Sequence, residues 1–220
     1  MRPSGSVCLI GPSERDVRRS YSHLSWRYIR DRTRVTLDRW RNPEAPWLTS
    51  EAVSLLGRLV RDDDIGLEFG AGRSTVWLGR RVRSLISIES DPEWFLKVDT
   101  MLVQAGLRPR VDLRLIEDDN EYVGQIDGLD DRSLDLCLVD GKVRDRCALA
   151  IIPKLRSGAV LVIDNIERYL PSDTSRSPNA RRRRLGPSSR SWSEFHRETV
   201  AWRAIWTSNG VFDTCLLFAP

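Results

Sequence analysis

Closely spaced cysteines and long apolar runs are both missing from this sequence of 220 residues. The four cysteines, Cys8, Cys137, Cys147 and Cys215, form no short-spaced pair, and two of them fall in apolar runs. We therefore expect reduced, buried thiols. No apolar run reaches the length of about 18 residues that a membrane-spanning helix needs, and the early run 7–10 is too short for a signal peptide. These absences favour a soluble, cytoplasmic protein without a membrane partner.

Histidine is scarce, and the net charge is small. His23 and His196 are the only histidines, and a lone histidine near tryptophan and phenylalanine, as His196 is, favours a structural role over that of a base. The formal net charge is +4, and much of the local excess lies in Arg176, Arg181–Arg184 and Arg190. A charge run confined to one segment is typical of a solvated loop, which disfavours a nucleic-acid partner.

The length is sufficient for one α/β domain with a substantial core. We place this domain at residues 49–220, after an N-terminal extension, 1–48, with short helices. Residues 167–190 are rich in proline, serine and arginine and predict an inserted loop. A loop of this length is either functional or disordered, and as a lid it would recognise an anionic substrate.

A strand, a glycine turn and a helix start are predicted between Ile65 and Thr75. Gly70 and Gly72 let the backbone turn sharply beside a ligand, and Ser74 or Thr75 can cap the following helix. Free amides at the start of such a helix suit the polar end of a nucleotide-like cofactor. Taken alone, the pattern also fits any tight strand-to-helix turn, because the third glycine of the dinucleotide fingerprint is missing.

An acidic residue at the end of the next strand makes the pattern more specific. Glu89 lies about 20 residues after the glycine turn, where a carboxylate can accept hydrogen bonds from both ribose hydroxyls. The sequence Glu68-x-Gly70-x-Gly72 followed by Glu89 resembles the first two motifs of class I S-adenosylmethionine (SAM)-dependent methyltransferases. The resemblance implies that the glycine turn passes the methionine part of SAM and that Glu89 holds the ribose. Nicotinamide dehydrogenases use related geometry and remain a competing interpretation.

Strand and helix patterns alternate along the chain. Apolar segments at 65–69, 84–89, 111–116, 134–139 and 158–163 predict parallel strands, and we expect a helix over 144–156 that Pro153 kinks. The turn Ser208-Asn209-Gly210 between 201–207 and 211–218 predicts an antiparallel hairpin. The fold class is therefore α/β, a Rossmann-like, doubly wound, seven-stranded sheet, mostly parallel with an antiparallel C-terminal hairpin strand. This ending fits the methyltransferase fold better than a dehydrogenase.

Oxygen-bearing side chains follow the fourth and fifth predicted strands. Asp140, Asp164 and Asn165 should meet at one edge of the sheet, and a hard cation such as Mg²⁺ accepts carboxylate and amide oxygens. The arrangement resembles the metal-dependent O-methyltransferases that act on catechols and macrolide sugars, which implies these three residues as Mg²⁺ ligands. Asp118, after the third strand, is a candidate for the adenine amino group.

The resemblance implies transfer of a methyl group from SAM to a hydroxyl of a small molecule. The predicted catalytic residues are Asp140, which also borders the cofactor, and Lys142 as general base. Arg144 is a poor base because guanidinium stays protonated. A metal-independent methyltransferase, in which Asp164 and Asn165 only end a strand, is the nearest alternative.

Two further interpretations belong to other classes of protein. One is a non-catalytic protein that binds nucleic acid or anions on the same scaffold, with Arg181–Arg184 as its contact. The other is an NAD-dependent oxidoreductase. The identity of the acceptor and the formation of a homo-oligomer do not follow from the sequence.

Overall fold

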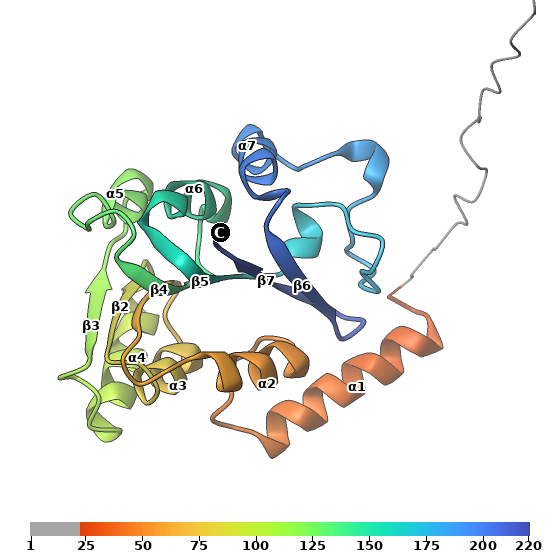
Figure 1. The fold of residues 1–220 in the computed structure, drawn as a ribbon. Helices are drawn as coiled ribbons and strands as arrows, with labels where there is room; N and C mark the ends of the chain where they lie inside the picture. The colour runs from red at the N-terminus through yellow and green to blue at the C-terminus, as the bar shows by residue number, and fades with distance from the viewer. Residues whose placement is uncertain (1–22) are drawn as a thin grey trace, which may run out of the picture.

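The computed structural model describes residues 23–220, so Cys8 and the run 7–10 lie outside the described residues (Figure 1). A seven-stranded sheet in the order β3-β2-β1-β4-β5-β7-β6 forms the centre of the molecule. The strands are β1 (Ile65–Phe69), β2 (Ser84–Glu89), β3 (Val111–Leu115), β4 (Leu134–Val139), β5 (Leu155–Asp164), β6 (Arg203–Ser208) and β7 (Asp213–Phe218). Strands β1 to β5 are parallel, whereas β7 is antiparallel to both β5 and β6. The predicted fold class is confirmed.

Helices cover both faces of this sheet (Figure 1). They are α1 (Trp26–Arg41), α2 (Ser50–Leu59), α3 (Arg73–Gly79), α4 (Pro92–Gln104), α5 (Asp119–Gly124), α6 (Arg144–Ala150) and α7 (Arg190–Thr199), with 3-10 turns η1 (Ile152–Lys154), η2 (Ile166–Arg168) and η3 (Arg183–Leu185). Helices α2, α3 and α4 pack on one face, and α5, α6 and α7 pack on the other. No helix of the described part of the chain is long and apolar enough to cross a membrane.

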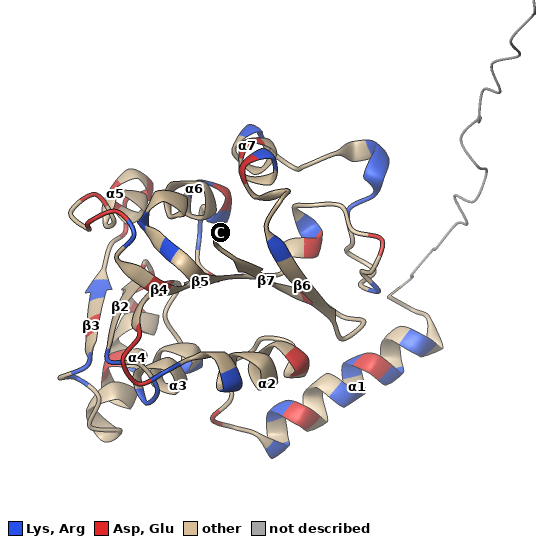
Figure 2. Ribbon diagram, in the orientation of Figure 1, with Lys and Arg blue, Asp and Glu red and all other residues tan. Residues whose placement is uncertain are grey.

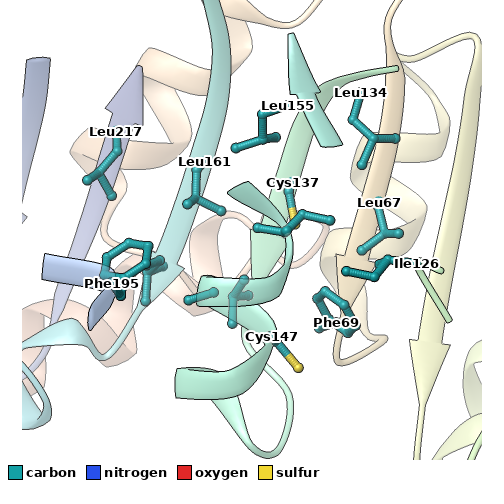
Figure 3. Packing of buried hydrophobic residues seen from close by; sticks show 14 of the residues in the cluster. Leu67, Phe69, Ile126, Leu134, Cys137, Cys147, Leu155, Leu161, Phe195 and Leu217 are labelled. Carbon is teal, nitrogen blue, oxygen red and sulfur yellow. The ribbon is translucent and has the colours of Figure 1, made fainter. Parts of the chain in front are cut away.

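Alternate residues of the central strands divide the core into two apolar clusters. In β4, Cys137 and Val139 join the cluster under α5, α6 and α7, whereas Leu136 and Leu138 join the other. This follows from the two-residue period of a strand that is buried on both faces. Figure 3 shows part of the first cluster, in which Cys137, Leu161 and Phe195 point into one apolar layer.

Several helix boundaries agree with the sequence signals. Thr49 caps α2, and Asp91 caps α4 with Pro92 at its first position. The helix expected over 144–156 was wrong: α6 ends at Ala150, and Pro153 lies in η1. Because proline has no N–H to continue a helix, and because Leu155 already pairs with Leu134, β5 begins three residues earlier than predicted.

The N-terminal extension and the insertion also differ in detail from the expectation. One helix of 16 residues, capped by Ser25, stands where short helices were expected. Hydrogen bonds tie the segment 167–190 to the domain, among them Arg176 N to Ser208 Oγ (3.0 Å), Ser177 Oγ to Val211 O (2.8 Å) and Ser189 Oγ to Asp145 Oδ2 (2.8 Å). The insertion therefore packs beside the end of the sheet next to α7 (Figure 1).

A substitution in β5 tests this core. Leu161 is fully buried in β5, so Leu161→Ala should lower the free energy of unfolding by about 2–5 kcal/mol, through lost burial and the cavity it leaves. Leu96→Ala removes the same atoms from an exposed position of α4 and should cost about 0.5 kcal/mol or less. Urea unfolding monitored by circular dichroism compares the two variants, and equal losses would contradict the assigned core.

Candidate active site

The loops that follow β1 and β4 touch each other at the carboxyl edge of the sheet. Gly70 has a φ of +96°, and a Cβ on it would lie 2.5 Å from the backbone nitrogen of Gly141. A side chain is therefore excluded at Gly70 by conformation and by space. A Cβ on Gly72 would make only van der Waals contacts, at 3.9 Å from Ser74 Oγ and from Trp94 Nε1, although the residue is buried. The turn is therefore tightly closed at Gly70 and less crowded at Gly72.

Glu68 is buried beneath this turn, where its carboxylate has no access to solvent. Its carboxylate is fully buried and accepts hydrogen bonds from Thr75 Oγ1 (2.5 Å) and Ser87 Oγ (2.7 Å). Thr75 Oγ1 in turn accepts the amide of Gly72 (2.8 Å). Glu68 and Thr75, both predicted to bind the cofactor, therefore shape the turn from within, and the neighbouring Ser74 is also buried.

Burial dominates the electrostatics of Glu68. It raises the pKa of this carboxyl from 4.5 to about 7, although hydroxyl hydrogen bonds lower the pKa in part. One of its oxygens, Oε1, is buried without a hydrogen-bond partner. Sequence reasoning missed Ser87, which pairs with Glu68 across β1 and β2; a serine in the middle of a buried strand was the available signal.

Glu89 reaches the glycine turn from the end of β2. Its Oε2 accepts the amide of Ala71 at 3.0 Å, and its Oε1 accepts the amides of Ser90 (2.6 Å) and Asp91 (2.8 Å). The side chain of Trp94, expected only to fill the core, also holds the turn, because its Nε1 donates to Ala71 O at 2.7 Å. The structure therefore brings the predicted acidic residue and the predicted glycine turn together.

Asp118 and Lys142 lie on the β3 side of this edge. Asp118 is exposed and caps α5 by accepting the amides of Asn120 (2.8 Å) and Glu121 (3.0 Å), which lower its pKa. Lys142 Nζ forms an ion pair with Asp119 at 2.8 Å and donates to Glu117 O. These contacts direct Lys142 toward the loop that carries Asp118 and not toward β5.

The three residues predicted to bind Mg²⁺ lie together, around the guanidinium of Arg144. Asp140 Oδ1 pairs with Arg144 Nη2 at 2.7 Å, and Asn165 Oδ1 lies 3.5 Å from Nη1. The backbone oxygen of Asp164 accepts from Nη1 at 2.6 Å, and its buried carboxyl accepts from Thr214 Oγ1 at 2.7 Å.

This arrangement does not fit a magnesium ion. Burial and the neighbouring carboxylate of Asp140 raise the pKa of Asp164 well above its usual range, and burial also raises the pKa of Asp140. The cation that faces these residues in the structure is the guanidinium of Arg144, which contacts the carboxylate of Asp140 and the amide oxygen of Asn165. Within residues 23–220, no three His, Cys, Asp or Glu side chains are grouped to hold a metal ion.

Two arginines flank a tryptophan at the rim of the same edge. The guanidinium carbons of Arg39 and Arg73 lie 4.8 and 5.4 Å from the ring centroid of Trp47. Arg39 also lies 5.5 Å from the ring centroid of Phe212, two residues before Thr214. Sequence reasoning missed this cluster, whose members come from separate elements.

Two cavities border this region. One of about 790 Å³ lies between α1, α2 and α3 and includes Arg39 and Trp77 in its lining. Another of about 280 Å³ lies between the β4–α6 loop and the insertion, with Tyr169 and Trp192 on one side and Lys142 on the other. The first cavity opens beside the N-terminal extension, and the second opens beside the insertion 167–190.

The comparisons with known proteins define the class. Residues 67–166 match a protein-family model described as a methyltransferase domain. Comparison with curated proteins gives no match. The match to a methyltransferase domain over residues 67–166 agrees with the predicted class I SAM-dependent methyltransferase, and the observed Rossmann-like fold agrees with it as well.

Solved structures with the same fold include three O-methyltransferases. One is a putative enzyme from Klebsiella pneumoniae (TM-score 0.55, 18% identity, 86% of this chain and 89% of that chain). Another is TomG from Streptomyces achromogenes, involved in tomaymycin synthesis and solved with SAM (TM-score 0.55, 20% identity, 86% and 90%). The third comes from Bacillus cereus, in complex with SAH (TM-score 0.56, 16% identity, 87% and 91%). At these identities the likeness concerns the fold.

The raised pKa of Glu68 predicts a pH-dependent stability. Because the folded state holds the proton up to about pH 7 and the unfolded state loses it near pH 4.5, this residue makes the protein less stable as pH rises between these values. Glu68→Gln stays neutral, so its stability relative to wild type should improve by about 3 kcal/mol between pH 4.5 and 7.5.

Urea unfolding at a series of pH values measures this difference. Glu167, whose pKa is also raised to about 7, is retained in both proteins, so its contribution cancels. The exposed Glu51→Gln serves as control and should follow wild type at every pH. A constant difference between Glu68→Gln and wild type would show that Glu68 does not titrate in this range.

Proposed function

We propose that this protein is a SAM-dependent methyltransferase that transfers a methyl group to a hydroxyl of a small, anionic molecule without a metal ion. The observation that supports this best is the contact between Glu89 and the glycine turn, 3.0 Å from Oε2 to the amide of Ala71. It places a carboxylate beside bare backbone at the carboxyl edge of a parallel sheet, where nucleotide-like ligands bind.

The residues around this contact suit the parts of SAM. Three amides fix the carboxylate of Glu89, which leaves it acceptor capacity for ribose hydroxyls. Gly72 has no side chain and only van der Waals neighbours at 3.9 Å, which suits a close approach of the methionine part of the cofactor to the backbone. Asp118 stands at the end of β3 as the candidate for the adenine amino group. Bound SAM supplies the sulfonium methyl group.

The rim cluster supports an anionic acceptor. Arg39 and Arg73 form no ion pair among the described residues, and both lie against Trp47. Guanidinium groups bind carboxylates and phosphates in two-pronged geometry, and an aromatic face beside them suits a planar acceptor. The cluster lies between the glycine turn, which Arg73 follows directly, and Phe212 at the end of the sheet.

Lys142 and the arginine run are given structural roles in this proposal. Because Lys142 is bound to Asp119 and Glu117, we assign it to positioning the loop that carries Asp118 rather than to proton transfer. Figure 2 shows the basic residues of the insertion in blue on the ribbon before α7. Arg181 donates to Gly186 O and Arg183 pairs with Asp173, so half of the run 181–184 is already engaged. This weakens the alternative of a nucleic-acid-binding protein.

Isothermal titration with SAH and, separately, with NAD tests the cofactor assignment. We expect wild type to bind SAH and not NAD. Glu89→Gln should weaken SAH binding about 10- to 100-fold, as expected for a lost hydrogen bond to a charged group. Glu93→Gln, at an exposed position of α4, should bind like wild type. Binding of NAD in place of SAH, or equal SAH binding by both variants, would contradict the proposal.

Paired acceptors test the anionic preference. With SAM as donor, methylation of 3,4-dihydroxybenzoate should exceed that of its methyl ester about tenfold, because only the acid can pair with Arg39 and Arg73. The double variant Arg39→Met, Arg73→Met should lose this preference, and Arg34→Met, on an exposed part of α1, should keep it. Equal rates for acid and ester in wild type would contradict an anion-binding rim.

A further inference from the structure

The guanidinium of Arg144 is held within the protein by four hydrogen bonds and one ion pair. Nε donates to Gly141 O at 2.9 Å. Nη2 donates to the backbone oxygen of Asp140 at 2.6 Å and forms an ion pair with its Oδ1 at 2.7 Å. Nη1 donates to Asp164 O at 2.6 Å and to Asn165 Oδ1 at 3.5 Å. The side chain is 15% exposed, so the group is built into the edge of the sheet.

These acceptors come from the ends of β4 and β5, and they include oxygens of all three residues that the sequence nominates as Mg²⁺ ligands. Magnesium needs near-octahedral oxygen coordination at about 2.0–2.1 Å. A guanidinium offers one delocalised positive charge in a fixed plane and has no open coordination position. Arg144 already engages the carboxylate of Asp140 and the amide oxygen of Asn165, so a dication at these oxygens would have to displace it against like-charge repulsion. The carboxyl of Asp164 accepts instead from Thr214 Oγ1.

The backbone at both strand ends is bent to allow this arrangement. Val143, directly before Arg144, has a φ of +39°, and Asn165 has a φ of +53°. A left-handed conformation is rare for a β-branched residue such as valine and persists only where surrounding contacts enforce it. The turn at Val143 starts α6 so that its first residue, Arg144, lies across the ends of the two strands.

We propose that Arg144 takes the place of a divalent cation at the carboxyl ends of β4 and β5, and that this edge therefore excludes metal ions. Arg144 is in this view a positioning residue, which joins the two strand ends and balances the charge of Asp140. The exclusion is a property of the folded chain. Only its consequence, methyl transfer without metal, rests on the proposed function.

Titration with Mn²⁺ followed by electron paramagnetic resonance tests the proposal, because the signal of the free ion falls when the ion binds. Wild type should leave the Mn²⁺ signal unchanged at millimolar concentrations. Arg144→Met keeps an apolar stem of similar length but frees Asp140, Asn165 and the carbonyl of Asp164. Its affinity for Mn²⁺ should rise about tenfold or more over wild type. Arg146→Met, two residues further on α6, should behave as wild type.

Two results of these titrations would contradict the exclusion of metal ions by Arg144. Saturable Mn²⁺ binding by wild type that Asp140→Asn removes would overturn the proposal, as would a folded Arg144→Met variant that binds Mn²⁺ no better than wild type. Circular dichroism establishes folding, and if Arg144→Met does not fold, Arg144→Gln and the wild-type titration decide. Titration of wild type with SAH in EDTA and in Mg²⁺ distinguishes the failure of one proposal from the failure of the other. If wild type does not bind SAH, the proposed methyltransferase function is contradicted. If wild type binds SAH and also binds Mn²⁺, the proposed exclusion of metal ions by Arg144 is contradicted.

Discussion

The close approach of two backbones, at Gly70 and Gly141, is the constraint on which the rest of this edge depends. The loops after β1 and β4 meet so tightly that a Cβ on Gly70 would collide with backbone, and a Cβ on Gly141 would collide with the hydroxyl of Tyr122. The loop after β1 therefore leaves the sheet with Gly70 fixed against Gly141, and Thr75 then holds the amide of Gly72. Arg144, three residues after Gly141, donates from Nε to the oxygen of that glycine.

The glycine turn is maintained by polar groups that no ligand touches. Glu68 is buried behind it, although burial makes its charged form costly, and the hydroxyls of Thr75 and Ser87 satisfy only one of its oxygens. A partly satisfied buried carboxyl destabilises a domain, so its presence is explained by the conformation it enforces. Glu68 fixes Thr75, and Thr75 fixes the amide of Gly72.

Local sequence patterns predicted the parts of the site that lie within one strand-turn-helix unit. Gly70, Gly72 and Glu89 follow from turn chemistry and spacing, and the Asn209-Gly210 turn gave the hairpin, because these signals involve near neighbours in the chain. The rim of Arg39, Trp47 and Phe212 could not be predicted, since its members meet only when α1 packs beside the hairpin. The placement of Arg144 depends on the left-handed turn at Val143, for which a valine gives no signal.

Buried carboxyls at the ends of parallel strands need a positive charge, and the source of that charge determines how an acceptor can be held. A metal ion would balance Asp140 and keep positions free for acceptor oxygens. Arg144 balances the same charge, but its three nitrogen atoms are already bound to protein oxygens, so the acceptor must be bound elsewhere. Arg39 and Arg73, which lack an ion-pair partner among the described residues, stand at the adjoining rim. The internal cation at the strand ends therefore leaves the binding of an acceptor to the rim, where Arg39 and Arg73 lie against Trp47.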